Sequence, residues 1–177
     1  MEIVGWLLLA ALLVLSPLSW MKPTPRQKKL VRLREEARSL GIKVTLTPLK
    51  LTDGTKIQGI AYRWLRPPEA PVMPGYLCLV RKEVEEVRPT WDEWVAGWVI
   101  GQGKKDFLTS NQMQHLNAWL AALPENVFAV EWGSATLALW WDERADPDIL
   151  SVWHHQVQEL LALPCKQPGH TKERGGE

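Results

Sequence analysis

The sequence predicts an α+β protein, with an N-terminal single transmembrane helix followed by a mostly antiparallel sheet with helices packed on one face. The uncharged run from Ile3 to Met21 is long enough to cross a bilayer as a helix. Later segments alternate apolar and polar residues around turn signals such as Asp53-Gly54, which is typical of antiparallel strands. Between them, apolar residues recur every three or four positions, which is typical of helices packed on a sheet.

The composition excludes several classes of protein. The chain has 177 residues, of which 46% are hydrophobic, too many for a disordered chain. Its 21 basic and 20 acidic residues give a net charge of +1, so a nucleic-acid partner bound through global charge is not expected. Two cysteines are too few for a disulfide-dense scaffold or a four-cysteine zinc ribbon.

Residues 1–22 are the predicted membrane anchor. Trp6 and Trp20 lie near its ends, where indole rings favour the membrane interface. A cleaved signal peptide and a buried core helix are the alternatives. The first fits less well because Glu2, rather than a basic cluster, precedes the run. The second would need a polar stripe, which the run lacks.

A basic collar follows the predicted anchor. Its six members are Lys22, Arg26, Lys28, Lys29, Arg32 and Arg34. The positive-inside rule predicts a single-pass protein with its N-terminus outside and its C-terminal domain in the cytoplasm. Together with Trp6 and Trp20, these residues form the predicted membrane interface. The collar either attracts anionic lipid or only sets the topology.

Residues 23–41 form a predicted basic juxtamembrane amphipathic helix. Thr24 or its neighbour caps it, Pro25 occupies its first position and Gly41 ends it. The apolar stripe consists of Leu30, Leu33, Ala37 and Leu40. This stripe packs on the following domain or lies on the membrane.

Residues 42–164 form the predicted cytoplasmic α+β domain. The first half begins with an alternating strand over 42–47, a turn at Asp53-Gly54 and a strand over 56–65 with a bulge at Gly59. A proline-rich loop over 66–74 and a strand over 76–81 follow. The segment 91–100 fits either a helix or a strand, and 101–105 is a predicted loop.

The second half of the domain contains two more helices and a hairpin. A helix over 111–123 has Ser110 as its expected cap, and a hairpin joins strands over 127–131 and 136–142. Asp146-Pro147-Asp148 opens the last helix and Pro164 ends it. Residues 165–177 are a predicted disordered tail.

No motif for catalysis is present, so we expect no catalytic residue, no cofactor and no metal. Gly101-Gln-Gly103-Lys104 lacks the spacing of a phosphate-binding loop, and the adjacent His154 and His155 point about 100° apart on a helix. No small-molecule substrate is evident. An enzyme whose site combines scattered residues such as His115, Glu131 or His154 is the alternative hypothesis.

The tryptophan content is high, with 11 Trp against 2 Tyr and 2 Phe. Most of the rings are expected in the core, and exposed ones are typical anchors of protein interfaces. The candidate partner surface consists of Trp91, Trp94, Trp98 and Trp140. The sequence therefore favours a membrane-anchored protein-interaction module without catalytic activity, bound to lipid through the anchor and to an unidentified protein partner.

The first 50 residues resemble YajC, a family of small bacterial membrane proteins that are accessory subunits of the preprotein translocase. The similarity rests on the apolar span, on Lys22-Pro-Thr-Pro-Arg-Gln-Lys-Lys29 and on Gly41-Ile-Lys-Val44 after the predicted helix. It implies a bacterial inner-membrane location and an alternative role in protein transport. The tryptophan-rich part after Pro67 has no counterpart in that family, so no functional residue is carried over.

Overall fold

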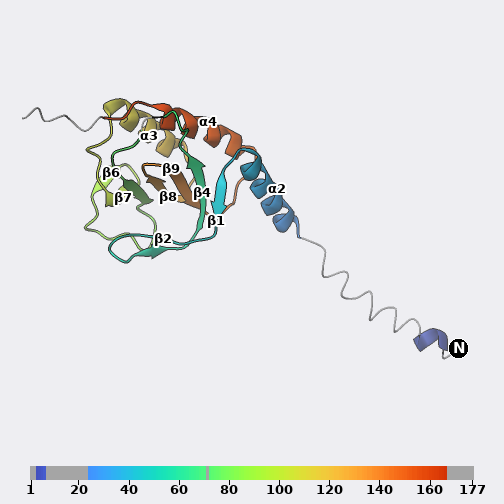
Figure 1. The fold of residues 1–177 in the computed structure, drawn as a ribbon. Helices are drawn as coiled ribbons and strands as arrows, with labels where there is room; N and C mark the ends of the chain where they lie inside the picture. Colours follow the sequence, from blue (N-terminus) through green and yellow to red (C-terminus); the bar gives the residue numbers. More distant parts are fainter. Residues whose placement is uncertain (1–2, 7–23, 71, 167–177) are drawn as a thin grey trace, which may run out of the picture.

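The computed structural model describes residues 3–6, 24–70 and 72–166, which form the ribbon of Figure 1. The longer helices are α2 (Pro25–Ser39), α3 (Ser110–Ala122) and α4 (Ile149–Ala162). The strands are β1 (Lys43–Thr45), β2 (Leu49–Lys50), β3 (Lys56–Ile57), β4 (Ile60–Leu65), β5 (Leu77–Arg81), β6 (Glu93–Val95), β7 (Trp98–Gly103), β8 (Val127–Trp132) and β9 (Thr136–Trp141).

The described strands form a seven-stranded sheet in the order β1-β4-β9-β8-β5-β7-β6 and a separate hairpin of β2 and β3. Every pairing is antiparallel. The structure therefore confirms an α+β domain with an antiparallel sheet. Its edge strands, β1 and β6, each have three residues.

One face of the sheet is covered by helices. Figure 1 shows α3 and α4 side by side over the sheet, with α2 beside β1. Leu33 and Ala37 of α2 are buried in the same core as Trp153 and Leu161 of α4. The ring of Trp141 packs edge-on against Tyr62 and Trp153, with centroids 5.1 and 4.9 Å apart. These aromatic contacts join β4, β9 and α4 into one core.

The opposite face of the sheet is covered as well. Side chains at alternate positions of its central strands point away from the helices, among them Ala61, Cys78 and Trp140. Leu49, Leu51 and Ile57, in and beside the β2–β3 hairpin, pack on this second face. Because both faces are buried, the strands contain few polar positions.

The predicted transmembrane helix is not supported. Within the described ranges, no helix combines the length and the apolar character needed to cross a membrane. The predictions of a single-pass inner-membrane protein and of its localisation are wrong on this finding. The rest of the expected span, including Trp20, lies outside the described residues, as does Lys22.

The predicted helix over 23–41 is present as α2, packed on the domain. Thr24 caps it through a capping box with Gln27, and Pro25 occupies the first turn. Helix α3 begins one residue earlier than expected because Thr109, not Ser110, forms a capping box with Gln112. Asp148 precedes α4 but makes no capping hydrogen bond through its side chain.

Three further segments differ from expectation. The strand predicted over 56–65 is divided into β3 and β4, which belong to different sheets, and Gly59 between them lies against the ring of Phe128 with no room for a Cβ. Gly101–Gly103, predicted as a loop, continues β7. Cys165, at the start of the predicted disordered tail, packs against the core with its Sγ 3.5 Å from Sδ of Met73. Within that tail, 167–177 lie outside the described residues.

Replacing Gly103 with alanine tests the close approach of β5 and β7. Gly103 has φ +92° and its Cβ would overlap the carbonyl of Tyr76, whereas Gly97 has φ +82° and open space around it. We expect Gly97→Ala to lower the free energy of unfolding by about 1–2 kcal/mol and Gly103→Ala to lower it by about 2–5 kcal/mol. Urea denaturation measures both, and equal losses would contradict the assigned register.

Candidate functional site

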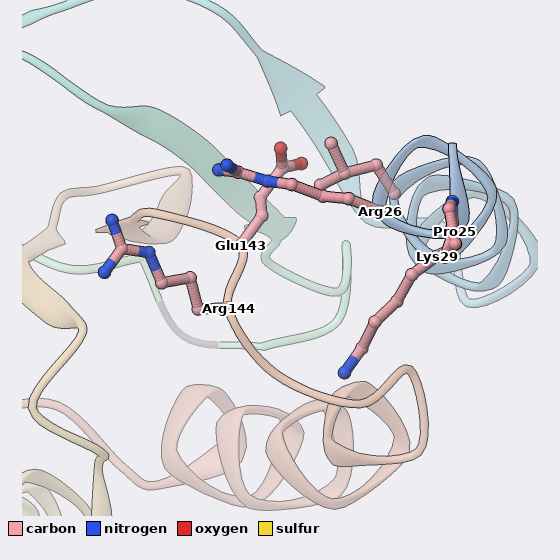
Figure 2. Close-up of a pocket in the computed structure, with 6 residues that line it drawn as sticks. Pro25, Arg26, Lys29, Glu143 and Arg144 are labelled. Atoms are coloured by element: carbon pink, nitrogen blue, oxygen red, sulfur yellow. The ribbon is translucent and has the colours of Figure 1, made fainter. Parts of the chain in front are cut away.

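A pocket opens between the first half of α2 and the loop that joins β9 to α4. Its volume is about 470 Å³, and it is lined by Pro25, Arg26, Lys29, Leu30, Glu143 and Arg144. Figure 2 shows the basic side chains around the opening, with Lys29 extending toward the start of α4. Pro25 and Leu30 supply apolar walls. The pocket therefore combines positive charge with apolar surface.

The basic groups of this pocket differ in how far they are neutralised. Lys29 Nζ lies 2.7 Å from Asp146 Oδ1, and Arg144 Nε lies 2.9 Å from Asp142 Oδ2, both as partly or largely exposed pairs. Such exposed pairs contribute little to stability. Among the described residues, Arg26 makes no ion pair. The pocket therefore retains basic groups for an incoming acidic group.

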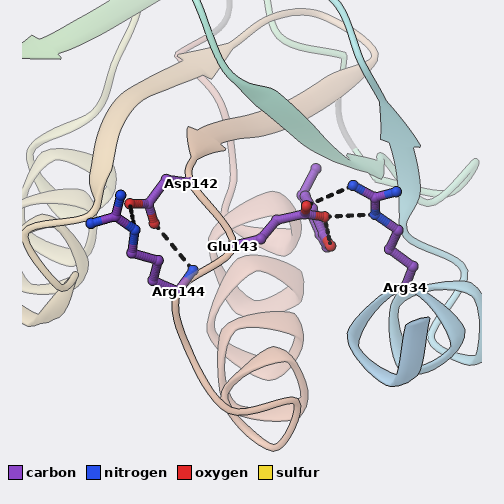
Figure 3. A network of polar contacts seen from close by, with 5 residues as sticks. Arg34, Asp142, Glu143 and Arg144 are labelled. Atoms are coloured by element: carbon purple, nitrogen blue, oxygen red, sulfur yellow. Dashed lines mark hydrogen bonds and ion pairs between the residues drawn. The ribbon is translucent and has the colours of Figure 1, made fainter. Parts of the chain in front are cut away.

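The position of the pocket depends on the buried carboxylate of Glu143. This side chain is 2% exposed, and it accepts hydrogen bonds from Arg34 Nε at 2.9 Å and Arg34 Nη2 at 2.7 Å. The Tyr62 hydroxyl donates a third bond, at 2.8 Å. Figure 3 shows Arg34 reaching from α2 to Glu143, beside the separate pair of Asp142 and Arg144. We call Arg34, Tyr62 and Glu143 the clamp.

The backbone at Glu143 is also unusual. Its φ is +59°, and in the described part of the chain no other non-glycine residue has a positive φ. A non-glycine residue in this conformation costs about 1–2 kcal/mol. The clamp offsets that cost, because a paired, hydrogen-bonded carboxylate is the form in which charge is stable inside a protein.

The clamp shifts the pKa of both groups that donate to Glu143. Burial raises the pKa of Tyr62 far above its usual range, and the hydrogen bond to Glu143 raises it further. The hydrogen bond to Glu143 raises the pKa of Arg34. Tyr62 therefore remains a neutral donor and Arg34 a charged one at any physiological pH.

A second opening lies farther along α2, where the helix faces β1. It has a volume of about 380 Å³ and is lined by Arg34, Arg38, Ile42, Lys43, Val44 and Leu46. Arg26, Leu30, Arg34 and Arg38 follow one another at four-residue spacing, so they lie along one stripe of the helix. This stripe connects the pocket to the second opening, with the clamp between them. We call the second opening the β1 groove.

The four tryptophans predicted as a partner surface do not form one. Trp98 and Trp140 are 2% and 1% exposed, so their assignment to a surface was wrong. Trp140 lies on the second face of the sheet, which the β2–β3 hairpin covers, and Trp98 lies in the core on the helix side. Trp91 is half-buried on that face, and half-buried Trp94 donates to Asn117 Oδ1 at 2.7 Å.

The predicted membrane-interface residues that the structure describes lie mainly on α2. Arg26, Lys28, Lys29 and Arg32 are exposed, and Trp6 is exposed outside the domain. Arg34 instead belongs to the clamp. The sequence indicated the basic character of α2 but not its connection to Glu143, 109 residues farther along the chain. Contact of these residues with lipid stays a prediction.

The scattered residues considered for an enzyme are not brought together. Glu131 lies on the sheet face opposite the helices, where burial raises its pKa. His115 is on α3 and lines a small opening beside Gln156 and Glu159, and its Nδ1 lies 2.9 Å from the carbonyl oxygen of Asn111. His154, on α4, does not line that opening. Within the described ranges, no cluster of acidic, histidine and cysteine side chains could hold a metal ion.

The free energy of unfolding measured at alkaline pH tests whether Tyr62, Tyr76 and Cys78 are buried. Burial raises the pKa of Tyr62, Tyr76 and Cys78 in the fold. As pH rises past about 8.5–10, the unfolded chain releases these protons while the folded chain keeps them. Stability is therefore full below this window and falls above it. Urea titrations should show a shallower fall for Tyr62→Phe, and an unchanged slope would contradict the buried position of Tyr62.

Comparisons with known proteins supply little beyond this geometry. No family model and no curated protein matches the sequence. Among solved structures, the chain is similar to the mycobacterial trehalose monomycolate transport factor A, TtfA, with a TM-score of 0.45 and 9% identity over 77% of this chain and 97% of that one. At that TM-score the likeness carries no argument about either protein. The resemblance to YajC is untested and stays a prediction.

Proposed function

We propose that the domain is a protein-interaction module that binds an acidic segment of a partner protein at the pocket between α2 and the β9–α4 loop. The observation that carries this proposal is the set of basic side chains around an opening with apolar walls. The helix supplies Arg26, Lys28, Lys29, Arg32, Arg34 and Arg38 against only two acidic residues, Glu35 and Glu36. The clamp gives this basic helix a fixed position on the domain.

The distribution of charge favours a peptide over an extended polyanion. Asp142 and Asp146 lie directly beside the basic groups, and a third opening along α2 contains Glu35, Glu36 and Asp148 as well as Arg32. A nucleic acid or an anionic membrane would place phosphates over these carboxylates and be repelled. A protein segment with a few well-placed acidic and apolar residues avoids that repulsion and fits the apolar walls.

The chemistry of the pocket favours binding over catalysis. A nucleophile activated by a neighbouring base is the usual mark of covalent catalysis. Here the groups that line the pocket are basic or apolar, and its carboxylate is held by Arg34 and Tyr62. These hydrogen bonds connect the loop after β9 to α2 and β4, which is a structural role. The module is therefore proposed as a non-enzymatic one.

Photo-crosslinking in intact cells tests the proposed function. A photoreactive residue in place of Leu30, in the full chain, should give one dominant protein adduct, and the crosslinked partner peptide should be acidic. The double reversal Arg26→Glu with Arg144→Glu should lower the adduct yield about tenfold or more, because it replaces attraction by repulsion at two positions. Mass spectrometry identifies the partner peptide and quantifies the adduct.

Lys56 provides the matched control, since it is exposed on the hairpin that covers the opposite face. A probe at position 56 should not give the same adduct, and Lys56→Glu should leave the adduct at position 30 unchanged. Adducts with lipid alone, or a protein adduct that survives the double reversal, would contradict an acidic protein partner at this pocket.

A further inference from the structure

The β1 groove lies beside a strand whose outer edge has no partner among the described strands. In the sheet order, β1 is terminal and pairs only with β4, through Lys43↔Arg63, Val44↔Tyr62 and Thr45↔Ala61. In an antiparallel ladder, alternate residues direct their N–H and C=O groups away from the partner strand. The outer edge of β1 therefore offers backbone donors and acceptors to another strand.

From this edge we infer that the partner binds as an extended strand added to β1, with its acidic side chains directed at the basic residues of the groove. This inference rests on the proposed function and names the form in which the acidic segment binds. Strand addition uses backbone hydrogen bonds for affinity and side-chain pockets for selectivity. The β1 edge and the β1 groove provide both.

The groove matches an acidic strand that also has apolar side chains. Arg38 and Lys43 are exposed and basic, while Ile42, Val44 and Leu46 form its apolar part. Leu46 is 68% exposed, which is unusual for leucine in a domain whose other leucines mostly lie in the core. In a strand, side chains alternate between two faces. Val44 shares the helix-covered face of the sheet with Tyr62, whereas Lys43 points to the other face. A partner that alternates acidic and apolar residues would therefore direct one kind toward α2 and Val44 and the other toward the side of Lys43.

The length of α2 sets the distance between this groove and the pocket. From Arg26 to Arg38 the helix rises about 18 Å, which is the length of about six residues in an extended strand. One short segment is therefore long enough to run from the pocket, past the clamp, to the β1 groove. The stripe of Arg26, Leu30, Arg34 and Arg38 would face it throughout.

The other edge of the sheet is less suited to the same partner. Strand β6 contains Glu93, which pairs with Lys82 at 2.6 Å, and its register with β7 shifts between Glu93 and Val95. An irregularity of this kind bends an edge away from further pairing. The acidic residue would also repel an acidic strand. The geometry therefore favours β1.

Amide hydrogen exchange with a synthetic peptide tests the inference. The probe is a peptide of about eight residues that alternates glutamate with valine, long enough to cover the groove. Bound to the full chain, it should slow exchange of the amides at 43–46 by about tenfold or more and leave those of β6 unchanged. A second peptide with the same side chains and N-methylated backbone amides should bind about tenfold more weakly, because it lacks the pairing donors.

Variants of the chain separate the two proposals. Arg38→Glu with Lys43→Glu should weaken the unmodified peptide about tenfold, and Lys56→Glu should not change its affinity. If the peptide binds but exchange at 43–46 stays unchanged, or the methylated peptide binds equally well, strand addition is wrong while an acidic-segment site remains. If neither peptide binds, strand addition is also overturned, and the crosslinking at position 30 decides separately on the proposed function.

Discussion

The buried carboxylate of Glu143 connects α2 to the sheet beside the proposed binding pocket. It lies in the loop after β9, and its three hydrogen bonds come from α2 and from β4. Removing one partner of a buried pair is costly because the remaining charge is left without compensation. Arg34 is 40% exposed, so water relieves part of that cost on its side, whereas Glu143 has no such relief. The clamp therefore fixes α2 mainly because the buried charge of Glu143 would be uncompensated without Arg34.

The core behind the clamp explains how a polar group is accommodated there. Tyr62 presents its hydroxyl to Glu143 and its ring to Trp141, which in turn packs on Trp153 of α4. An aromatic residue with a polar tip is suited to such a boundary between apolar core and charge. The packed rings of Tyr62, Trp141 and Trp153 thus connect the sheet, the last helix and the clamp. Because α2 is fixed in this way, its basic stripe has a defined position next to both the pocket and the β1 groove.

Local patterns in the sequence predicted most of the elements. The alternation in 42–47 and 76–81, the turn at Asp53-Gly54 and the cap at Thr24 depend on neighbouring residues, and each appears in the structure. Within the domain, the predictions that failed depend on contacts between distant residues. Coverage of the second sheet face buries Trp140, and the predicted strand is divided because β3 pairs with β2 whereas β4 pairs with β1 and β9. The basic residues of the candidate site were visible, but Arg34 was assigned to a membrane interface because its partner lies 109 positions away.

The central claim is that the clamp, and not helix propensity alone, holds α2 in place. Amide hydrogen exchange of Glu143→Gln tests it most directly, because a helix of 15 residues is marginal in water without tertiary contacts. The account predicts that the amides of α2 lose much of their protection while those of β8 and β9 keep theirs. Equal protection of α2 in Glu143→Gln and in the unaltered chain would contradict it.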